Sequence, residues 1–187
     1  MEKKRRRRRR RKKKIYNLNS KIIDGNKDYA ERLKNWIDPS RKIKAELLYR
    51  LSENGDKFST FHELCDNKGP TLTLFHVNDG NKVGIYTPLS WDRTSNWKND
   101  METFIFNLNK NKKYKKLKSD CSAYCSTSYG PYTIYFGNES NKSMKSITLY
   151  GNGINSYYDK GSEILSNNNE TKVYDLLETE VYKIIIE

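Results

Sequence analysis

Residues 71–87 contain Thr71-Leu72-Thr73-Leu74-Phe75-His76-Val77, then Asn78-Asp79-Gly80, then Val83-Gly84-Ile85-Tyr86-Thr87. The two outer runs are rich in β-branched and aromatic residues, which are enriched in strands. The segment between them has the residue types that tight turns favour. This stretch therefore predicts an antiparallel β-hairpin.

Four further runs of the same character follow the hairpin, at Thr103–Leu108, Tyr132–Phe136, Ser146–Tyr150 and Glu180–Ile186. Segments rich in Asn, Gly and Ser separate them, as expected of turns. Strands do not alternate with helical segments, so a parallel sheet built from βαβ units is not expected. The sequence predicts an α+β fold that is mainly β, a two-sheet antiparallel β-sandwich with a few flanking short helices.

The flanking helices are expected before the hairpin. Apolar residues recur at helical spacing from Asp28 to Ile37, and Asp38-Pro39-Ser40 follows as a stop signal. A second helix is expected from about Lys42 to Ser52, with Asn54-Gly55 as its C-terminal stop. The residues expected to face inward from these two helices are Tyr29, Leu33, Trp36, Ile37, Ile43, Leu47, Leu48 and Leu51.

A third, short helix is expected just before the hairpin. Thr60-Phe61-His62-Glu63 has the spacing of a capping box, in which a Ser or Thr side chain and a Glu three residues later cap the helix start. The helix should run to about Asp66, because Asn67-Lys68-Gly69-Pro70 breaks it.

Positive charge is concentrated at the N-terminus. Residues 3–14 are all Lys or Arg, and these twelve cations with Glu2 account for +11 of the formal net charge of +13. The rest of the chain has a net charge of only +2, which is too small for a dedicated nucleic-acid-binding domain. Charge repulsion and the lack of apolar groups predict a disordered tail over residues 1–20. The tail cations are Lys3, Lys4, Arg5, Arg6, Arg7, Arg8, Arg9, Arg10, Arg11, Lys12, Lys13 and Lys14.

Three interpretations of the tail remain open. It fits a nuclear-import signal, an electrostatic anchor for polyanions (RNA, DNA or acidic lipid), or a product of purine-codon slippage without a selected role. Each Lys or Arg near an anionic membrane contributes about 1 kcal/mol to the free energy of binding, so twelve of them could hold the chain on a polyanion, as the second interpretation requires.

The three cysteines, Cys65, Cys121 and Cys125, are too few and odd in number for a disulfide framework. A reducing compartment follows, so cytoplasmic localisation is expected, or nuclear if the tail directs import. No window approaches the roughly 18 apolar residues of a membrane-spanning helix, so no transmembrane segment is expected. A monomer is expected.

Signatures of catalysis and of metal binding are missing. His62, Cys65, His76, Cys121 and Cys125 do not have zinc-ligand spacing. Common nucleotide-binding and hydrolase motifs do not occur either. We expect no catalytic residue, cofactor or metal, although a thiol-based peroxide scavenger is an open alternative that would need a cysteine with a lowered pKa.

Several stretches resemble the TLDc domain family. They are Leu47–Ser52, Phe61–Leu74 with its Lys68-Gly69-Pro70-Thr71-Leu72-Thr73-Leu74 run, Gly84–Thr87 with Trp91, Phe104–Leu108 and Glu180–Lys183. The resemblance covers about residues 42–187, with residues 21–41 as a lead-in helix. The family-motif residues, expected to be structural, are Leu48, Arg50, Phe61, Cys65, Asp66, Lys68, Gly69, Pro70, Thr71, Leu72, Trp91, Glu180, Val181 and Tyr182.

The resemblance implies a two-sheet antiparallel sandwich with flanking helices and no generally accepted active site. It also implies a non-enzymatic protein-binding module linked to oxidative-stress protection and to regulation of the vacuolar proton pump (V-ATPase), which is the expected partner. The sequence departs from the family pattern where Val83-Gly84-Ile85 replaces Phe-Gly-Gly, and where Tyr129-Gly130-Pro131 and Phe136-Gly137 replace a longer glycine-rich stretch.

Overall fold

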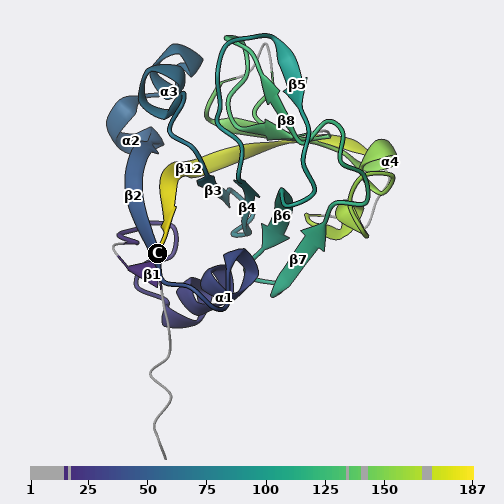
Figure 1. The fold of residues 1–187 in the computed structure, drawn as a ribbon. Helices are drawn as coiled ribbons and strands as arrows, with labels where there is room; N and C mark the ends of the chain where they lie inside the picture. The colour runs from purple at the N-terminus through teal and green to yellow at the C-terminus, as the bar shows by residue number, and fades with distance from the viewer. Residues whose placement is uncertain (1–14, 17, 134, 140–142, 166–169) are drawn as a thin grey trace, which may run out of the picture.

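The computed structural model describes residues 15–16, 18–133, 135–139, 143–165 and 170–187 (Figure 1). The elements in chain order are β1 (Ile15–Tyr16), α1 (Lys27–Ile37), β2 (Ile43–Arg50), α2 (Leu51–Asn54), α3 (Phe58–Cys65), β3 (Thr71–Val77), β4 (Lys82–Thr87), β5 (Asn96–Lys98), β6 (Phe104–Asn107), β7 (Lys112–Lys115), β8 (Ala123–Cys125), β9 (Tyr132–Thr133), β10 (Phe136–Gly137), β11 (Ser146–Tyr150), α4 (Gly151–Ile154), the 3₁₀ helix η1 (Gly161–Glu163) and β12 (Thr171–Ile186).

The fold is mainly β and almost entirely antiparallel, as predicted. Within the described residues, ten strands form one sheet along the path β7-β6-β4-β3-β12-β11-β10-β9, with β2 on β12 and β1 on β2. β5 and β8 form a separate two-stranded sheet. The β1–β2 pairing is parallel, and every other pairing between these strands is antiparallel. The predicted hairpin is β3–β4.

The long strand β12 joins the two halves of the sandwich. One edge pairs with β3 over residues 176–183, while the other pairs with β11 over residues 171–175 and with β2 over residues 180–186. The register shifts twice along β12, and such bulges bend a strand and increase its twist. The strands β9–β11 therefore cover one face of the main sheet, and Phe136 and Ile147 share a buried core with Phe75 and Ile105.

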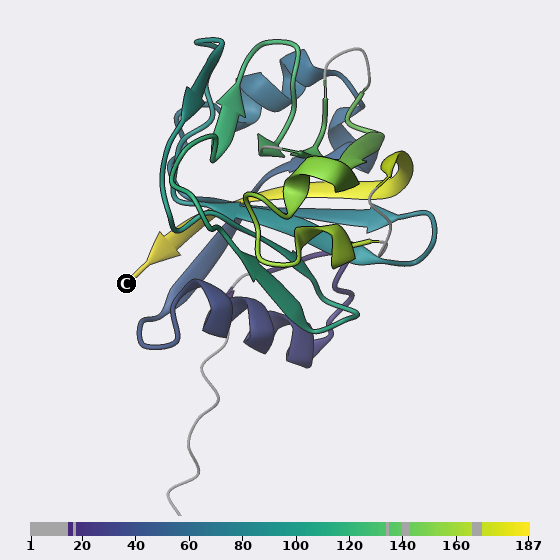
Figure 2. The same ribbon diagram turned by 90° about the vertical axis from the view of Figure 1, so that its right-hand side faces the viewer.

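Helix α1 covers the opposite face of the main sheet (Figure 2). Its inner residue Leu33 is fully buried and shares a core with Leu74 and Phe106, against which Trp36 packs. The helix begins where the Asn26 side chain accepts hydrogen bonds from the backbone N–H groups of residues 28 and 29, at 3.0 and 3.2 Å. The predicted helix over Asp28–Ile37 is confirmed to within one residue.

Gly84 is the one residue of the family's Phe-Gly-Gly pattern that this chain keeps. A Cβ at this position would lie 2.1 Å from the Thr73 carbonyl oxygen and 2.5 Å from the Phe106 ring. Only glycine permits this close approach of β3, β4 and β6. The central glycine of the Phe-Gly-Gly pattern is therefore required here, although the residues on either side of it differ.

The predicted helix over Lys42–Ser52 is wrong. Residues Ile43–Arg50 form strand β2, and only Leu51–Asn54 are helical. Ile43, Ala45 and Tyr49 point inward, whereas Leu47 is 38% exposed. The apolar spacing fits a helix equally well, but pairing with β12 and β1 supplies a hydrogen-bond ladder that overrides the local pattern.

Two smaller predictions also need correction. Helix α3 begins at Phe58 with Lys57 as its N-cap and no side-chain cap, so Thr60 and Glu63 lie inside the helix and form no capping box. The run Tyr132–Phe136 is not one strand, because β9 and β10 pair with each other antiparallel as two short strands. Tyr135, which lies between the two strands, has φ +66°, and this left-handed backbone conformation interrupts the extended run.

The folded part begins earlier than the predicted boundary after residue 20. Residues 15–16 form β1, Ser20 is buried, and Ile22 and Ile23 belong to the same core as α1. Leu18, Ile22 and Ile23, which follow the charge run, supply this anchoring. The average composition of the first 20 residues, which the cations dominate, does not reveal it. The cations at residues 3–14 lie outside the described residues. None of the helices in the described part of the chain is long and apolar enough to cross a membrane.

Candidate functional site

Three family-motif residues meet in a buried polar network. The carboxylate of Glu180 on β12 is completely buried, and its Oε1 accepts hydrogen bonds from Arg50 Nε at 2.8 Å and from the Lys21 backbone N–H at 2.9 Å. Its Oε2 accepts from the Tyr182 hydroxyl at 3.1 Å and from the Ser20 hydroxyl. A carboxylate with four internal donors and no exposed surface has no face left for a substrate.

Arg50 is also held by several partners within the chain. Besides Glu180, its guanidinium donates to Glu53 Oε1 and to the Asn19 carbonyl oxygen, both at 2.7 Å. Its side chain is only 7% exposed. The network therefore fastens the segment around residue 20 to β2 and β12.

The motif residues around α3 form a second internal cluster. Phe61, Cys65 and Trp91 are buried together, and Trp91 Nε1 donates to Thr71 Oγ1 at 2.9 Å. Asp66 lies on the rim of this cluster, where its carboxylate contacts Arg93 at 3.1 Å.

His62 completes this cluster and is nearly fully buried. Its Nδ1 lies 2.7 Å from Asp66 Oδ1, and its Nε2 lies 2.8 Å from the Ser126 carbonyl oxygen. Both ring nitrogens are therefore occupied by partners within the chain, which leaves neither for a substrate.

The Lys68-Gly69-Pro70 turn starts the hairpin. Gly69 adopts φ +81° and donates its N–H to Ser90 Oγ at 3.0 Å, while the Pro70 carbonyl accepts from the Ile184 N–H at 2.8 Å. Leu72, Val181 and Tyr182 are buried, Leu48 is half-buried and Lys68 is exposed. The structure thus divides most of the motif residues between two internal clusters and this turn, and it does not bring them to a common open cleft.

The cysteines do not have the electrostatics of reactive thiols. Cys65 and Cys125 are buried, and burial raises both pKa values, that of Cys125 to about 11. Burial also raises the pKa of Cys121, with a further contribution from nearby Asp120. Among the described residues, no group of three or more His, Cys, Asp or Glu side chains could hold a metal ion.

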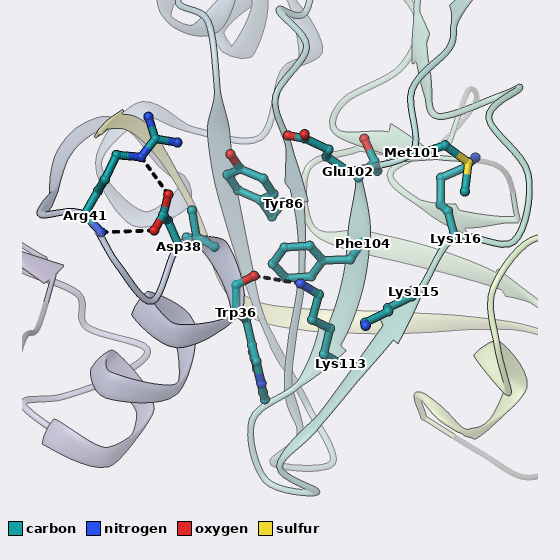
Figure 3. Close-up of a pocket in the computed structure, with 12 residues that line it drawn as sticks. Trp36, Asp38, Arg41, Tyr86, Met101, Glu102, Phe104, Lys113, Lys115 and Lys116 are labelled. Carbon is teal, nitrogen blue, oxygen red and sulfur yellow. Dashed lines mark hydrogen bonds and ion pairs between the residues drawn. The ribbon is translucent and has the colours of Figure 1, made fainter. Parts of the chain in front are cut away.

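A cavity of about 440 Å³ lies between the end of α1 and the strands β4, β6 and β7 (Figure 3). Its aromatic lining comes from Trp36, Tyr86 and Phe104. The charged and remaining lining residues are Ile37, Asp38, Arg41, Met101, Glu102, Thr103, Lys113, Lys115 and Lys116. Ligand sites in proteins are commonly concave, partly apolar and of this size.

Lys113 is one of the lysines that line the cavity. Its Nζ lies 3.9 Å from the centroid of the Phe104 ring and donates a hydrogen bond to the Trp36 carbonyl oxygen at 2.6 Å (Figure 3). Burial and the neighbouring Lys115 lower the pKa of its amine. Lys116 is buried, donates to the Asp120 carbonyl at 2.6 Å, and has its pKa lowered by burial.

The sequence motifs did not identify these cavity residues as a candidate site. One local signal was present, because Lys112, Lys113, Lys115 and Lys116 flank Tyr114 and alternation along a strand sends Lys113 and Lys115 to one face. The segments that complete the cavity come together only through the sheet topology.

The architecture defines a mainly β, antiparallel sandwich-like domain. In a scan of family models, the TLDc domain model matches residues 16–185. The chain therefore belongs to the TLDc domain family, and the match begins at β1 rather than near residue 42. A search of curated proteins found no match.

Proposed function

We propose that this TLDc domain is a non-enzymatic protein-binding module whose partner is a membrane-associated complex, the vacuolar proton pump foremost. Through that partner it would contribute to oxidative-stress protection. The observation that carries the proposal is the internal saturation of the motif side chains. Glu180 and Arg50 satisfy each other and their neighbours inside the fold, so the surface is left as the place where function resides.

The experiment is ATP-driven proton pumping by purified vacuolar membranes with the full chain added, while release of the peripheral sector of the pump is followed by sedimentation. We expect a dose-dependent change in pumping or in release. The matched control is a chain without residues 2–14, which keeps β1 and the buried Ser20. Equal effects of both chains would assign the activity to the domain. No effect of the full chain and no binding to the membranes would contradict the proposal.

A second candidate function is electrostatic binding of a polyanion through residues 3–14, supported by their twelve consecutive cations. Its expected signature is a steep loss of affinity with salt, with a logarithmic slope of about −0.7 per phosphate neutralised on a single strand. A titration of polyuridylate at several salt concentrations measures this slope. A chain without residues 2–14 that bound as tightly would count against this candidate.

The thiol-based peroxide scavenger has less physical support. The chemistry requires a thiolate, and a raised pKa keeps a cysteine protonated at neutral pH. All three cysteines have raised pKa values.

A further inference from the structure

Two lysines of β7 face the cavity rather than the outer rim of the sheet. In the β6–β7 register, Lys115 lies opposite Phe104 and Lys113 opposite Phe106. Phe104 and Phe106 belong to the core beneath α1, whereas Tyr114 belongs to the core on the other face. The side chains of Lys113 and Lys115 therefore stand on the cavity side of the sheet.

Positive charge in the cavity exceeds what the fold neutralises. Arg41 pairs with Asp38 at 2.7 Å, which offsets one cation and one carboxylate. Lys113 and Lys115 then face a single remaining carboxylate, Glu102, because the Lys116 ammonium lies 5.5 Å from the Tyr158 ring, in the core on the other face of the sheet. Lys113 and Lys116 use carbonyl oxygens as partners, and Lys115 makes no ion pair within the described part of the chain.

Apolar surface accompanies this charge. The rings of Tyr86 and Phe104 lie 5.1 Å apart and form one wall (Figure 3). Met101 at the rim is 54% exposed. Methionine is common at surfaces that accept varied apolar side chains, because its chain is flexible and polarisable. Tyr86 and Phe104 are themselves only 4% and 2% exposed, so the half-buried Trp36 and Ile37 complete the apolar seat with Met101.

We propose that this cavity is the docking site for an acidic peptide segment of the partner protein. One apolar or aromatic side chain of the segment lies between Met101 and the Tyr86–Phe104 wall, and a flanking carboxylate pairs with Lys115 and Lys113. The inference rests on the proposed function, because it names the surface with which the binding module would hold its partner.

Charge and size favour a peptide over a nucleic acid. Lys113 directly contacts only a carbonyl oxygen and an aromatic ring, so a peptide carboxylate beside it would form the direct ion pair that this half-buried amine does not make with Glu102. Glu102 would repel a phosphodiester backbone, whereas its carboxylate can accept hydrogen bonds from peptide N–H groups. A volume of about 440 Å³ accommodates a few side chains and not a continuous strand of nucleotides.

The test measures binding of a fluorescein-labelled peptide, in which glutamates flank one phenylalanine, to the full chain by fluorescence anisotropy. Lys115→Glu is compared with Lys172→Glu, which makes the same charge change at an exposed lysine of β12. Both variants retain residues 3–14, so electrostatic attraction by that segment is the same in each. We expect Lys115→Glu to weaken the affinity about tenfold more than Lys172→Glu does.

A second pair of variants tests the apolar seat. Met101→Ser should weaken binding more than Leu177→Ser, which changes another exposed apolar residue, one that does not line the cavity. A peptide with serine in place of the phenylalanine should bind the parent chain less tightly. Equal effects within either pair of variants, or equal binding of the two peptides, would overturn the inference. A competition experiment could also overturn it. If polyuridylate displaced the peptide from the parent chain but not from Lys115→Glu, the cavity would be a nucleic-acid site.

The inference and the proposed function can fail separately. If Lys115→Glu lost the peptide but still bound vacuolar membranes like the parent chain, the cavity would not be the partner surface and the proposed function would stand. If the parent chain bound the peptide through Lys115 but bound no membrane complex, the partner named in the proposed function would be wrong and the acidic-peptide site would stand.

Discussion

Arg50 Nε lies 2.8 Å from Glu180 Oε1, and this buried ion pair joins two strands whose residues are 130 positions apart in the sequence. It also collects the segment around residue 20, because Glu180 accepts from Ser20 and Lys21 while Arg50 donates to the Asn19 carbonyl. One carboxylate thus fastens three segments of the chain together.

Glu180→Gln should therefore destabilise the protein strongly. Removing one partner of a buried ion pair leaves the other charge uncompensated, which typically costs about 3–5 kcal/mol. The free energy of unfolding in urea measures the loss. Glu46→Gln is the matched control, because the Glu46–Lys44 pair spans 2.7 Å, close to the 2.8 Å of the buried pair, but both of its side chains are more than a third exposed. The control should lose less than about 1 kcal/mol, and equal losses would mean that the network does not fasten the fold.

Truncation should reveal where the folded part begins. Removing residues 2–14 is expected to leave the melting temperature nearly unchanged. Removing residues 2–24 also removes Ile22 and Ile23 from the core and the Ser20 and Lys21 donors from Glu180. Each buried isoleucine contributes about 1.5–3 kcal/mol, so this chain should lose at least about 3 kcal/mol or fail to fold. Circular dichroism melting decides, and equal melting temperatures would place the boundary after residue 24.

The hairpin was predictable because its information is local. Strand residues, a turn rich in Asn, Asp and Gly, and a second strand follow one another within residues 71–87, so no distant contact is needed to interpret them. Helix α1 was predictable for the same reason, since its periodicity and its stop signal are contiguous.

Strand β2 was not predictable from its own residues. Its apolar spacing satisfies a helix, and only pairing with β12, far away in the sequence, selects the strand. The Arg50–Glu180 contact was invisible for the same reason, although both residues belong to the family motif. The cavity forms only where α1, β4, β6 and β7 come together. The alternating lysines of β7 indicated one wall of it, but no local pattern indicated the aromatic wall.

Stability should fall in acid partly through Asp92. Burial alone would raise its pKa, but hydrogen bonds from Lys98 and Thr94 outweigh burial and lower the pKa from 3.8 to about 2. Because the folded state holds the charged form, its contribution is complete above about pH 4 and is lost as the pH falls to about 2.

Asp92→Asn measures this contribution. At pH 6 the variant should be less stable by roughly 1 kcal/mol, and at pH 2 the difference should disappear. Asp175→Asn, at an exposed position on β12, controls for the loss of one negative charge. Urea unfolding at several pH values provides the measurement. A difference between the parent chain and Asp92→Asn that stayed constant from pH 6 to pH 2 would show that the Asp92–Lys98 pair does not cause the acid sensitivity.

Thiol reactivity should be low, and this tests the peroxide-scavenger alternative directly. Cys65 and Cys125 are buried, so a disulfide reagent should reach them only after unfolding. Cys121 is partly accessible but has a raised pKa, so its reaction at pH 7 should be slower than that of free cysteine and should accelerate as the pH rises. Stopped-flow absorbance with the reagent, on the parent chain and on Cys121→Ser, should show one slow reacting thiol that the variant lacks.

Peroxide consumption by the parent chain should match that of a variant with all three cysteines replaced by serine. A fast phase at pH 7 that Cys121→Ser removes, together with faster peroxide loss in the parent chain, would reverse this conclusion and make the thiol chemistry functional.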